Sequence, residues 1–353
     1  AREIVTPYGP ACVVEQSSAA DCFHGIAKVG ECRAFDPAAL EILRGAKERG
    51  LFTVMEQTIA ARAYEEEVLA EEDRRFPGWN SAPRLRGRYT QETIEREAEE
   101  WKHADLITCG SQFVKDSVAH CGGPVERCVV VPYGVDASFA PIERPPHDGP
   151  LRVLSVGEAG LRKGVTYAAE LGERLKGKAE FRWVGPVSLT AEGRKQAEGR
   201  VELTGAIPRS QILPHYEWAD VFFLPSVCEG SATVVYEALQ TGLPVVTTPN
   251  AGSLVEDGVN GFITPIRDLD AMEQRLLELR GDCALRGRMS LAARASQDKV
   301  SLDAYQARLV RLKQGVVKPG SLGWGRGGGP HAPSPPTHPY PAGRPGVRVR
   351  TGL

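Results

Sequence analysis

Short apolar runs alternate along the chain with longer runs in which apolar and charged residues recur at helical spacing, from about residue 20 to residue 315. Apolar runs of roughly 4–8 residues bounded by turn-forming residues are typical of strands, and the longer runs are typical of helices. The predicted strands cover residues 21–26, 51–58, 105–111, 128–136, 151–157, 180–185, 201–207, 221–226, 243–249 and 261–266.

Amphipathic helices are predicted between these strands. In the run 36–50, Asp36 is placed to cap the helix, Pro37 suits its first turn and Gly50 ends it. Because short buried strands alternate with helices, the chain is predicted to be of the α/β class with parallel sheets. The other helical runs include residues 61–75, 90–104, 112–122 and 231–240.

A Pro-rich stretch at 140–150 divides the alternation into two blocks, which predicts two doubly wound domains joined by a linker. The first block, 1–139, holds fewer strand-like runs than a complete domain of this kind, and the chain starts with Ala1. We therefore expect an incomplete, N-terminally truncated first domain. The second domain is predicted over 151–315, and the Gly/Pro-rich stretch 316–353 is predicted to be a disordered tail.

Composition narrows the class of protein. The 353 residues are 42% hydrophobic and 25% charged, with a net charge of −2, which gives no global attraction to nucleic acid or anionic lipid. No apolar run reaches the roughly 20 residues that a membrane span needs. The eight cysteines include no Cys-x-x-Cys pair and no zinc-like spacing. These features favour a cytoplasmic protein with reduced thiols.

The segment around 228–246 holds the strongest candidate chemistry. Glu229 and Gly230 follow the predicted strand 221–226, and Ser231 is placed to cap a helix that carries Glu237. Ligands of open α/β sheets bind beyond the carboxyl ends of the strands, and a helix start attracts phosphate. Two carboxylates roughly 9–12 Å apart suit the hexose and ribose hydroxyls of a nucleotide sugar. Any two exposed glutamates would give weaker evidence, but here the surrounding turns support the site.

A pair of cations follows another predicted strand. Gly157 ends the run 151–157, and Arg162 and Lys163 come just before the next predicted helix. Two adjacent cations at a strand's carboxyl end can stabilise a departing diphosphate. A solvated basic turn is the plainer interpretation of such a pair. The match of the neighbouring motifs to a known family, given next, favours the phosphate-binding interpretation.

These motifs resemble those of retaining glycosyltransferases of the family 4 type, also called glycosyl transferases group 1. The family's Glu-x7-Glu pair matches Glu229 and Glu237, its Gly-x-Pro-Val-Val run matches 242–246, and its Asp-Gly-x-x-Gly-Phe matches 257–262. The resemblance covers roughly residues 20 to 315. It implies the GT-B fold, in which two Rossmann-like domains face a cleft.

The resemblance assigns roles on the donor side. Arg162 and Lys163 would hold the diphosphate, Glu229 the transferred hexose and Glu237 the ribose. Many family members have an arginine where this chain has Glu158, and Arg162 would take its place. The residues expected to line the donor site are Gly157, Gly230, Ser231, Ala232 and Glu237, with Glu229, Lys163 and Arg162 expected to act in catalysis.

On the acceptor side, the stretch 107–136 is similar to the family's Ser-x-Phe-Val and Pro-Tyr-Gly-Val-Asp segments. Many members carry a histidine at the end of the strand matching 51–58, where this chain has Glu56 and Gln57. These two residues are the acceptor-side candidates, and His24 is the nearest alternative histidine. A histidine at a strand end is more often structural than catalytic.

The predicted function is that of a retaining transferase that moves a hexose from a nucleotide-diphosphate sugar to an acceptor hydroxyl. The acceptor would be a saccharide, a lipid-linked sugar or a small molecule, and peripheral membrane contact is compatible with this. No cofactor and no metal are implied, because the acidic residues Asp270 to Glu273 fit a helix capping box. No dinucleotide-binding glycine pattern occurs. Two alternatives are a non-catalytic nucleotide-sugar-binding fragment and a sugar-nucleotide epimerase of similar fold.

Overall fold

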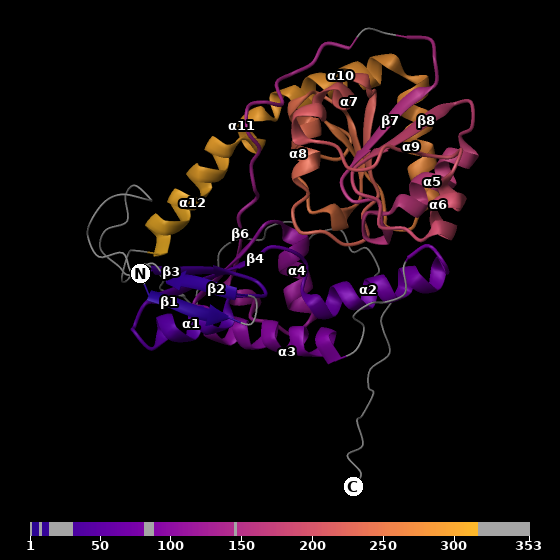
Figure 1. Cartoon of the computed structure of the whole chain (residues 1–353). Helices are drawn as coiled ribbons and strands as arrows, with labels where there is room; N and C mark the ends of the chain where they lie inside the picture. Colours follow the sequence, from indigo (N-terminus) through magenta and orange to yellow (C-terminus); the bar gives the residue numbers. More distant parts are fainter. Residues whose placement is uncertain (1, 7–8, 14–30, 81–87, 145–146, 317–353) are drawn as a thin grey trace, which may run out of the picture.

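The computed structural model describes residues 2–6, 9–13, 31–80, 88–144 and 147–316 (Figure 1). The strand predicted at 21–26, the candidate His24 and the tail beyond residue 316 lie outside the described residues. Two parallel sheets form the centres of two halves, as the alternation predicted.

The first half is built on a sheet of four parallel strands in the order β3-β4-β5-β6. The strand β3 was not predicted, although Cys32 and Ala34 are buried in it and alternate with polar neighbours. The strands β1 (Arg2–Thr6) and β2 (Gly9–Val13) form a separate antiparallel hairpin. The strands of the four-stranded sheet are β3 (Glu31–Phe35), β4 (Phe52–Gln57), β5 (Leu106–Cys109) and β6 (Cys128–Val130).

Helices surround this first sheet and enclose a core that includes Leu43, Met55, Trp101 and Ile107. One short helical turn, η1 (Val125–Arg127), leads into β6. The helices are α1 (Leu40–Lys47), α2 (Arg62–Arg75), α3 (Arg88–His103) and α4 (Gln112–His120), which confirms the helical runs predicted at 36–50, 61–75, 90–104 and 112–122.

The prediction that Asp36 caps its helix is wrong. The helix α1 starts at Leu40 after Ala39, with no side-chain cap. Asp36 instead accepts hydrogen bonds from the backbone N–H of Thr58 at 2.7 Å and from its hydroxyl at 2.6 Å. A contact with the neighbouring strand end therefore replaces the local cap. Gly50, with a φ of 69°, ends the segment in the left-handed conformation, as predicted.

The second half is built on a six-stranded parallel sheet in the order β12-β11-β10-β7-β8-β9. From the central β7 the chain winds outward to β8 and β9, and later outward on the other side through β10. The direction of winding therefore switches between β7 and β10, and ligands of such sheets bind at this point. The strands are β7 (Leu151–Val156), β8 (Ala179–Val184), β9 (Glu202–Leu203), β10 (Val221–Leu224), β11 (Val245–Thr247) and β12 (Gly261–Ile263).

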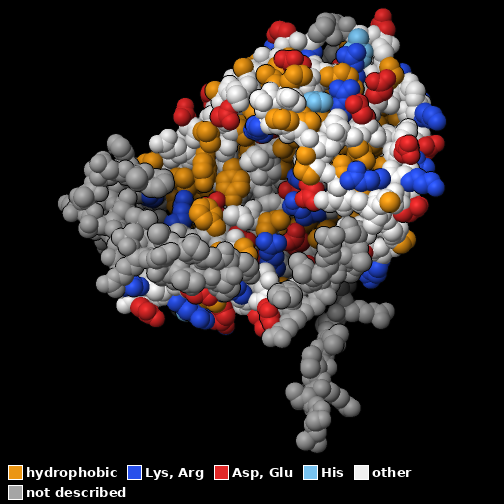
Figure 2. Space-filling view, in the orientation of Figure 1, with side chains coloured by type: hydrophobic (Ala, Val, Ile, Leu, Met, Phe, Trp, Pro, Cys, Tyr) orange, Lys and Arg blue, Asp and Glu red, His pale blue; other side chains and the backbone are white. Residues whose placement is uncertain are grey.

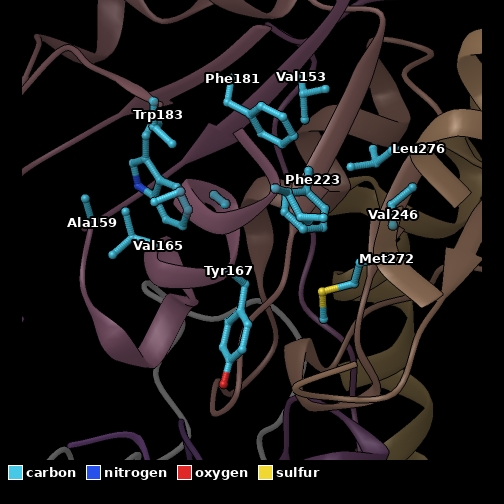
Figure 3. Packing of buried hydrophobic residues seen from close by; sticks show 14 of the residues in the cluster. Val153, Ala159, Val165, Tyr167, Phe181, Trp183, Phe223, Val246, Met272 and Leu276 are labelled. Carbon is cyan, nitrogen blue, oxygen red and sulfur yellow. The ribbon is translucent and has the colours of Figure 1, made fainter. Parts of the chain in front are cut away.

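Both faces of the second sheet are buried. Val153, Phe181 and Phe223 pack on one face, in the cluster seen in Figure 3, and Leu154 and Phe222 pack on the other. This explains why the inner strand β10, with the sequence VFFL, is wholly apolar. The covering helices are α5 (Val165–Arg174), α6 (Ala191–Ala197), α7 (Leu213–Trp218), α8 (Thr233–Gln240), α9 (Leu269–Gly281) and α10 (Cys283–Ala295), with the short turns η2 (Leu161–Lys163), η3 (Arg209–Gln211) and η4 (Pro249–Ala251).

The helix α9 is capped differently from the prediction. Asp268 accepts from the backbone N–H of Ala271 at 2.9 Å, so the helix is capped two residues before the Asp270 of the predicted capping box, and that box is wrong. The helix buries Met272, together with Leu276 and Leu279, on one face as expected.

The last described helices return towards the first half. The helix α11 (Gln297–Val300) leads into α12 (Leu302–Val316), which runs from the second half towards the first sheet (Figure 1). Arg308 donates to the carbonyls of Pro132 and Tyr133 at 3.0 Å each. Figure 2 shows hydrophobic side chains gathered between α12 and α8, where the halves meet.

Candidate functional site

The two predicted donor-side motifs lie at the switch point of the second sheet. One loop leaves β7 at Gly157 and carries Arg162 and Lys163 on η2, and the other leaves β10 and carries Glu229. Because β7 and β10 are neighbouring parallel strands, both loops emerge at the same edge of the sheet. Figure 2 shows charged side chains of both signs adjoining in the hollow between the halves.

The two loops are bound to each other through their backbones. The N–H of Val227 donates to the carbonyl of Arg162 at 2.9 Å. Gly164, with a φ of 80°, lies so close to the other loop that a Cβ there would be 2.3 Å from the Pro225 oxygen. Only glycine fits this approach without a shift of the backbone. The cations therefore sit on a turn whose position is fixed by the neighbouring strand's loop.

Arg162, Lys163 and Glu229 form one charge cluster. The Glu229 Oε1 lies 2.8 Å from the Lys163 Nζ and 3.2 Å from the nearer Arg162 Nη. Glu229 is buried, and 29% of the Arg162 side chain is exposed against 11% for Lys163. The Lys163 stem crosses Gly157, where a Cβ would come within 2.8 Å of its Cε. An arriving phosphate would thus meet cations that are already gathered around a carboxylate.

Glu237, the second glutamate of the pair, is held differently. It is 2% exposed, and its Oε1 accepts from an Arg209 Nη at 2.6 Å while its Oε2 accepts from the Tyr216 hydroxyl at 2.7 Å. Burial, followed by the charge of Glu237, raises the pKa of Tyr216 well above its usual range. Arg209 is 60% exposed and lies 4.8 Å from the centre of the Phe139 ring. Arg209 therefore covers Glu237 on its solvent side.

The loop between β10 and α8 touches the first half. The Glu229 carbonyl accepts from the Ala60 N–H at 3.3 Å, and the Gly230 carbonyl accepts from the Ser111 hydroxyl at 2.5 Å. A Cβ on Gly230 would lie 2.0 Å from the Thr58 oxygen. Gly230 is thus required for the close approach of the two halves at this site.

The prediction that Ser231 caps the following helix is wrong. The helix α8 begins at Thr233, and Ala232 precedes it without a side-chain cap. The Ser231 hydroxyl instead lies 2.6 Å from the Tyr236 hydroxyl, and both groups are buried. The first N–H groups of α8 are therefore not used by Ser231.

Glu158 is exposed beside the cation loop and accepts a hydrogen bond from the Ser188 hydroxyl. Its carboxylate is thus turned towards the loop after β8. The charge cluster at Glu229 is built without it.

The acceptor-side candidates differ in their surroundings. Glu56 is 6% exposed and lies beside Tyr133 and Tyr305, and burial raises its pKa although the Tyr133 hydroxyl donates to it. Gln57 is fully buried: its amide donates to Glu97 at 2.8 Å and accepts from the Trp101 indole N–H at 2.9 Å. Glu56 therefore lies beside two tyrosines, whereas the polar atoms of Gln57 are engaged inside the first half.

Several residues of this region were not singled out in the sequence. Arg209 and Tyr216 lie 28 and 21 residues from Glu237 and carry no motif, and Glu97 looks like an ordinary polar helix residue. Among the described residues no three His, Cys, Asp or Glu side chains are grouped as metal ligands would be. The described helices include none that is long and apolar enough to cross a membrane.

A comparison with known proteins matches the segment that holds this candidate site. Residues 150–282 match the family model described as glycosyl transferases group 1. The matched segment contains the second sheet with the loops of Lys163 and Glu229. It therefore covers the donor-side motifs and excludes the first half.

Two curated relatives illustrate the similarity. The chain is 32% identical over 208 residues to the amylovoran biosynthesis glycosyltransferase AmsK of Erwinia amylovora, covering 54% of this chain and 51% of AmsK. It is 28% identical over 245 residues to the GDP-mannose-dependent α-(1-6)-phosphatidylinositol monomannoside mannosyltransferase of Mycolicibacterium smegmatis, covering 60% and 63%. The chain spans about half the length of the first curated relatives that it matches, 48% to 51%.

Solved structures match over both halves. HepE of Anabaena, crystallised with UDP and glucose, gives a TM-score of 0.62 at 16% identity, covering 80% of this chain and 77% of HepE. Sucrose-phosphate synthase of Thermosynechococcus elongatus also gives 0.62 at 16% identity, covering 81% and 73%. At such identities the likeness shows the fold alone. It confirms the predicted GT-B arrangement of parallel α/β sheets.

Proposed function

We propose that this protein is a glycosyltransferase that uses a nucleotide-diphosphate sugar. One observation carries the proposal: Arg162, Lys163 and Glu229 converge at the switch point of the second sheet. Two cations next to a carboxylate suit a donor that combines a diphosphate with sugar hydroxyls. The match of residues 150–282 to glycosyl transferases group 1 supports the same proposal.

On this proposal the second half, 151–315, binds the donor, and the stretch 140–150 links it to the first half. Arg162 and Lys163 hold the diphosphate and stabilise the negative charge that develops on it as it leaves. The start of α8 adds its free N–H groups, and Gly230 leaves room for the ligand. Gly157, Ser231 and Ala232 line the same loops.

The two glutamates take different parts of the donor. Glu229 accepts from hydroxyls of the transferred hexose, and Glu237 lies at the ribose end. For Glu237 to reach a ribose, the exposed Arg209 must share its carboxylate or move away, because Glu237 itself is 2% exposed. The Glu229 carboxylate likewise exchanges part of its pairing with the cations when a phosphate arrives.

In the reaction the bond between the anomeric carbon and the diphosphate oxygen breaks, and the acceptor oxygen bonds to that carbon. The acceptor proton ends on the released diphosphate or on solvent, so that atoms and charge balance. We propose retention of the anomeric configuration, in keeping with the resemblance to family 4 enzymes. The acceptor hydroxyl is proposed to lie near Glu56, which stands beside Tyr133 in the first half.

The acceptor is proposed to be a saccharide, a lipid-linked sugar or a small molecule. The two relatives compared above are named for exopolysaccharide synthesis and for transfer of mannose to a phosphatidylinositol mannoside. We propose that the reaction takes place in the cytoplasm, because the cysteines in the described part of the chain are free thiols.

The proposal is tested in two steps. A thermal-shift screen of UDP, GDP and ADP sugars should raise the melting temperature with the matching donor, since a ligand of the folded state stabilises it by mass action. Product analysis with that donor should then give a nucleoside diphosphate and a glycosylated acceptor. An isomeric nucleotide sugar would indicate an epimerase instead, and unchanged donor a binding protein.

Glu229→Gln sharpens the assignment. This variant should keep most of its affinity for the bare nucleoside diphosphate but lose turnover and the extra affinity that the sugar contributes. Its control is Glu217→Gln, which removes an exposed carboxylate on α7. Equal losses of diphosphate and sugar binding in Glu229→Gln would overturn the role given to Glu229.

A further inference from the structure

The helix α2 belongs to the first half by sequence but is packed into the second. Its buried residues, Glu65, Val68 and Glu72, form one stripe along the helix. Val68 and the nearby Trp79 belong to the same hydrophobic cluster as Trp183 of the second sheet. The helix therefore joins the two halves through a shared core.

The segment after α2 is bound to the second half as well. The Trp79 carbonyl accepts from the Thr190 N–H at 3.1 Å, and Asn80 forms an isolated bridge with Leu189. A Cβ on Gly193, in α6, would lie 2.7 Å from the Trp79 oxygen. In Figure 1 the end of α2 lies beside α6. The contact is therefore close along the backbone as well as between side chains.

Glu72 lies at the centre of this contact and is fully buried. Its Oε1 accepts from the Arg267 Nε at 2.6 Å, and its Oε2 accepts from the Tyr167 hydroxyl at 2.7 Å. Both partners come from the second half. Tyr167 lies at the edge of the cluster in Figure 3, with its hydroxyl pointing away from the other labelled residues.

Arg267 is held in an unusual backbone conformation. Its φ is 68°, the left-handed region that side-chain-bearing residues seldom adopt. Its guanidinium also donates to the Val68 carbonyl at 3.4 Å. A buried carboxylate needs such partners, because an ionised group without them is strongly disfavoured away from water. Arg267 thus adopts the left-handed backbone conformation while its guanidinium serves the buried Glu72 carboxylate.

The other end of α2 leads to the donor loop. The residues just before the helix, 58–61, are fixed by the first half: the Ala61 N–H donates to the Ser117 hydroxyl at 2.9 Å. The Arg62 N–H donates to Glu97 at 2.8 Å. From this segment the Ala60 N–H donates to the Glu229 carbonyl at 3.3 Å. The helix thus connects the Glu72 contact to the backbone of the candidate donor site.

We propose that Glu72, held by Tyr167 and Arg267, is a positioning residue for the donor site. It fixes α2 to the second half and so keeps residues 58–61 against the backbone of Glu229 and Gly230. Glu72 touches no proposed substrate group, so its effect is on the placement of Glu229 relative to the first half. The effect on turnover rests on the proposed function, whereas the effect on the segment 58–61 does not.

The test compares Glu72→Gln with Glu71→Gln. The neighbouring Glu71 is on the same helix, but its carboxylate pairs with Arg74 and Arg75 of that helix, and Arg267 acts on it only as a nearby charge. Hydrogen exchange of the peptide containing residues 58–62, followed by mass spectrometry, should be at least tenfold faster in Glu72→Gln. It should be unchanged in Glu71→Gln.

Binding and turnover give the second readout. Because the diphosphate is held by the second half, Glu72→Gln should bind the nucleoside diphosphate found in the screen within about twofold of wild type. Its kcat for release of nucleoside diphosphate should fall about tenfold or more. Tyr167→Phe removes one hydrogen bond and keeps the ring, so it should give a smaller change of the same kind, even if Glu72→Gln folds poorly.

Two results would overturn the inference. The first is a hydrogen-exchange rate of residues 58–62 that is the same in Glu72→Gln and Tyr167→Phe as in the control Glu71→Gln. The other is an equal rise of exchange over the whole chain, which would make Glu72 a general stability residue. If wild type binds no nucleoside diphosphate, the proposed function fails, but the exchange experiment still decides whether Glu72 positions the segment.

Discussion

The buried glutamates of the two halves differ in their surroundings. In the second half, Glu229 and Glu237 lie next to cations, from η2 in one case and η3 in the other. In the first half, Glu97 accepts from the Gln57 amide and the Arg62 backbone N–H, and burial raises its pKa to about 7 although the charge of Arg62 lowers it. Glu100 accepts from the backbone of Ala39 and Leu40, and burial raises its pKa to about 7 although the Arg96 Nε lies 3.4 Å away.

The charged groups of the second half are therefore available to a ligand, whereas the buried carboxyls of the first half support the fold. A cation paired with a carboxylate at a sheet edge can turn to an incoming phosphate, because the pair is partly exposed at Arg162. A carboxyl on which burial outweighs the nearby cation offers little to a ligand and is partly protonated near neutral pH. The second half is therefore the better candidate for chemistry on an anion, and the first half for a pH-dependent stability.

The largest effect is expected from Lys163→Ala. The loss of a charge-assisted contact in a partly desolvated site should weaken nucleoside diphosphate binding by about 1.5–3 kcal/mol, which is more than tenfold. Binding of the nucleoside alone should change little. Isothermal titration calorimetry with both ligands measures this, with Lys195→Ala on α6 as the control. Equal losses for both ligands would mean that Lys163 supports the fold and not the phosphate.

The pH dependence of stability tests the first half. The folded state holds the Glu97 and Glu100 protons more tightly than the unfolded chain, so their favourable contribution is complete below about pH 4.5 and is lost as the pH rises through about 7. We expect them to lower the free energy of unfolding by about 1–3 kcal/mol between pH 5 and 8. Urea denaturation should show a flatter profile for Glu97→Gln and an unchanged one for the exposed Glu95→Gln. A profile unaffected by Glu97→Gln would contradict this.

Glu237→Gln tests whether the buried partner of Arg209 supports the fold of the second half. We expect a loss of about 1 kcal/mol in unfolding free energy, because the exposed Arg209 limits the strength of the pair through solvent screening. The loss should be larger than that in Glu229→Gln, whose partners lie on a loop. Denaturation curves of the two variants give the comparison, and a larger loss in Glu229→Gln would reverse it.

The smallest effect is expected from Glu158→Arg. The side chain is exposed and turned towards Ser188, so a cation there would act on a bound diphosphate mostly through solvent. We expect tighter diphosphate binding by a few-fold, or about 0.5–1 kcal/mol. Titration in low and high salt would show the gain fading as ions screen it. Weaker binding in Glu158→Arg would show that Glu158 itself supports the site.

The donor side was largely predictable from the sequence, because its geometry follows from local order. The apolar runs of β7 and β10 predict buried parallel strands, and the carboxyl ends of such strands lie at one edge of a sheet. Arg162, Lys163 and Glu229 therefore had to emerge close together once the strand order was known. The order of the strands in the sheet cannot be predicted from any single segment, and this order decides which loops are neighbours.

The sequence by itself determined the alternation of strands and helices and the turns at glycine, since these depend on periodicity and on backbone freedom at single positions. The partner of Asp36 was decided by tertiary structure, because a strand end 22 residues along the chain offered that side chain other hydrogen bonds, whereas Ser231 pairs locally with Tyr236, five residues away. The burial of Glu72 was decided there too. Its helix has no apolar stripe, and the partner Arg267 lies 195 residues away, a distance over which local sequence carries no signal.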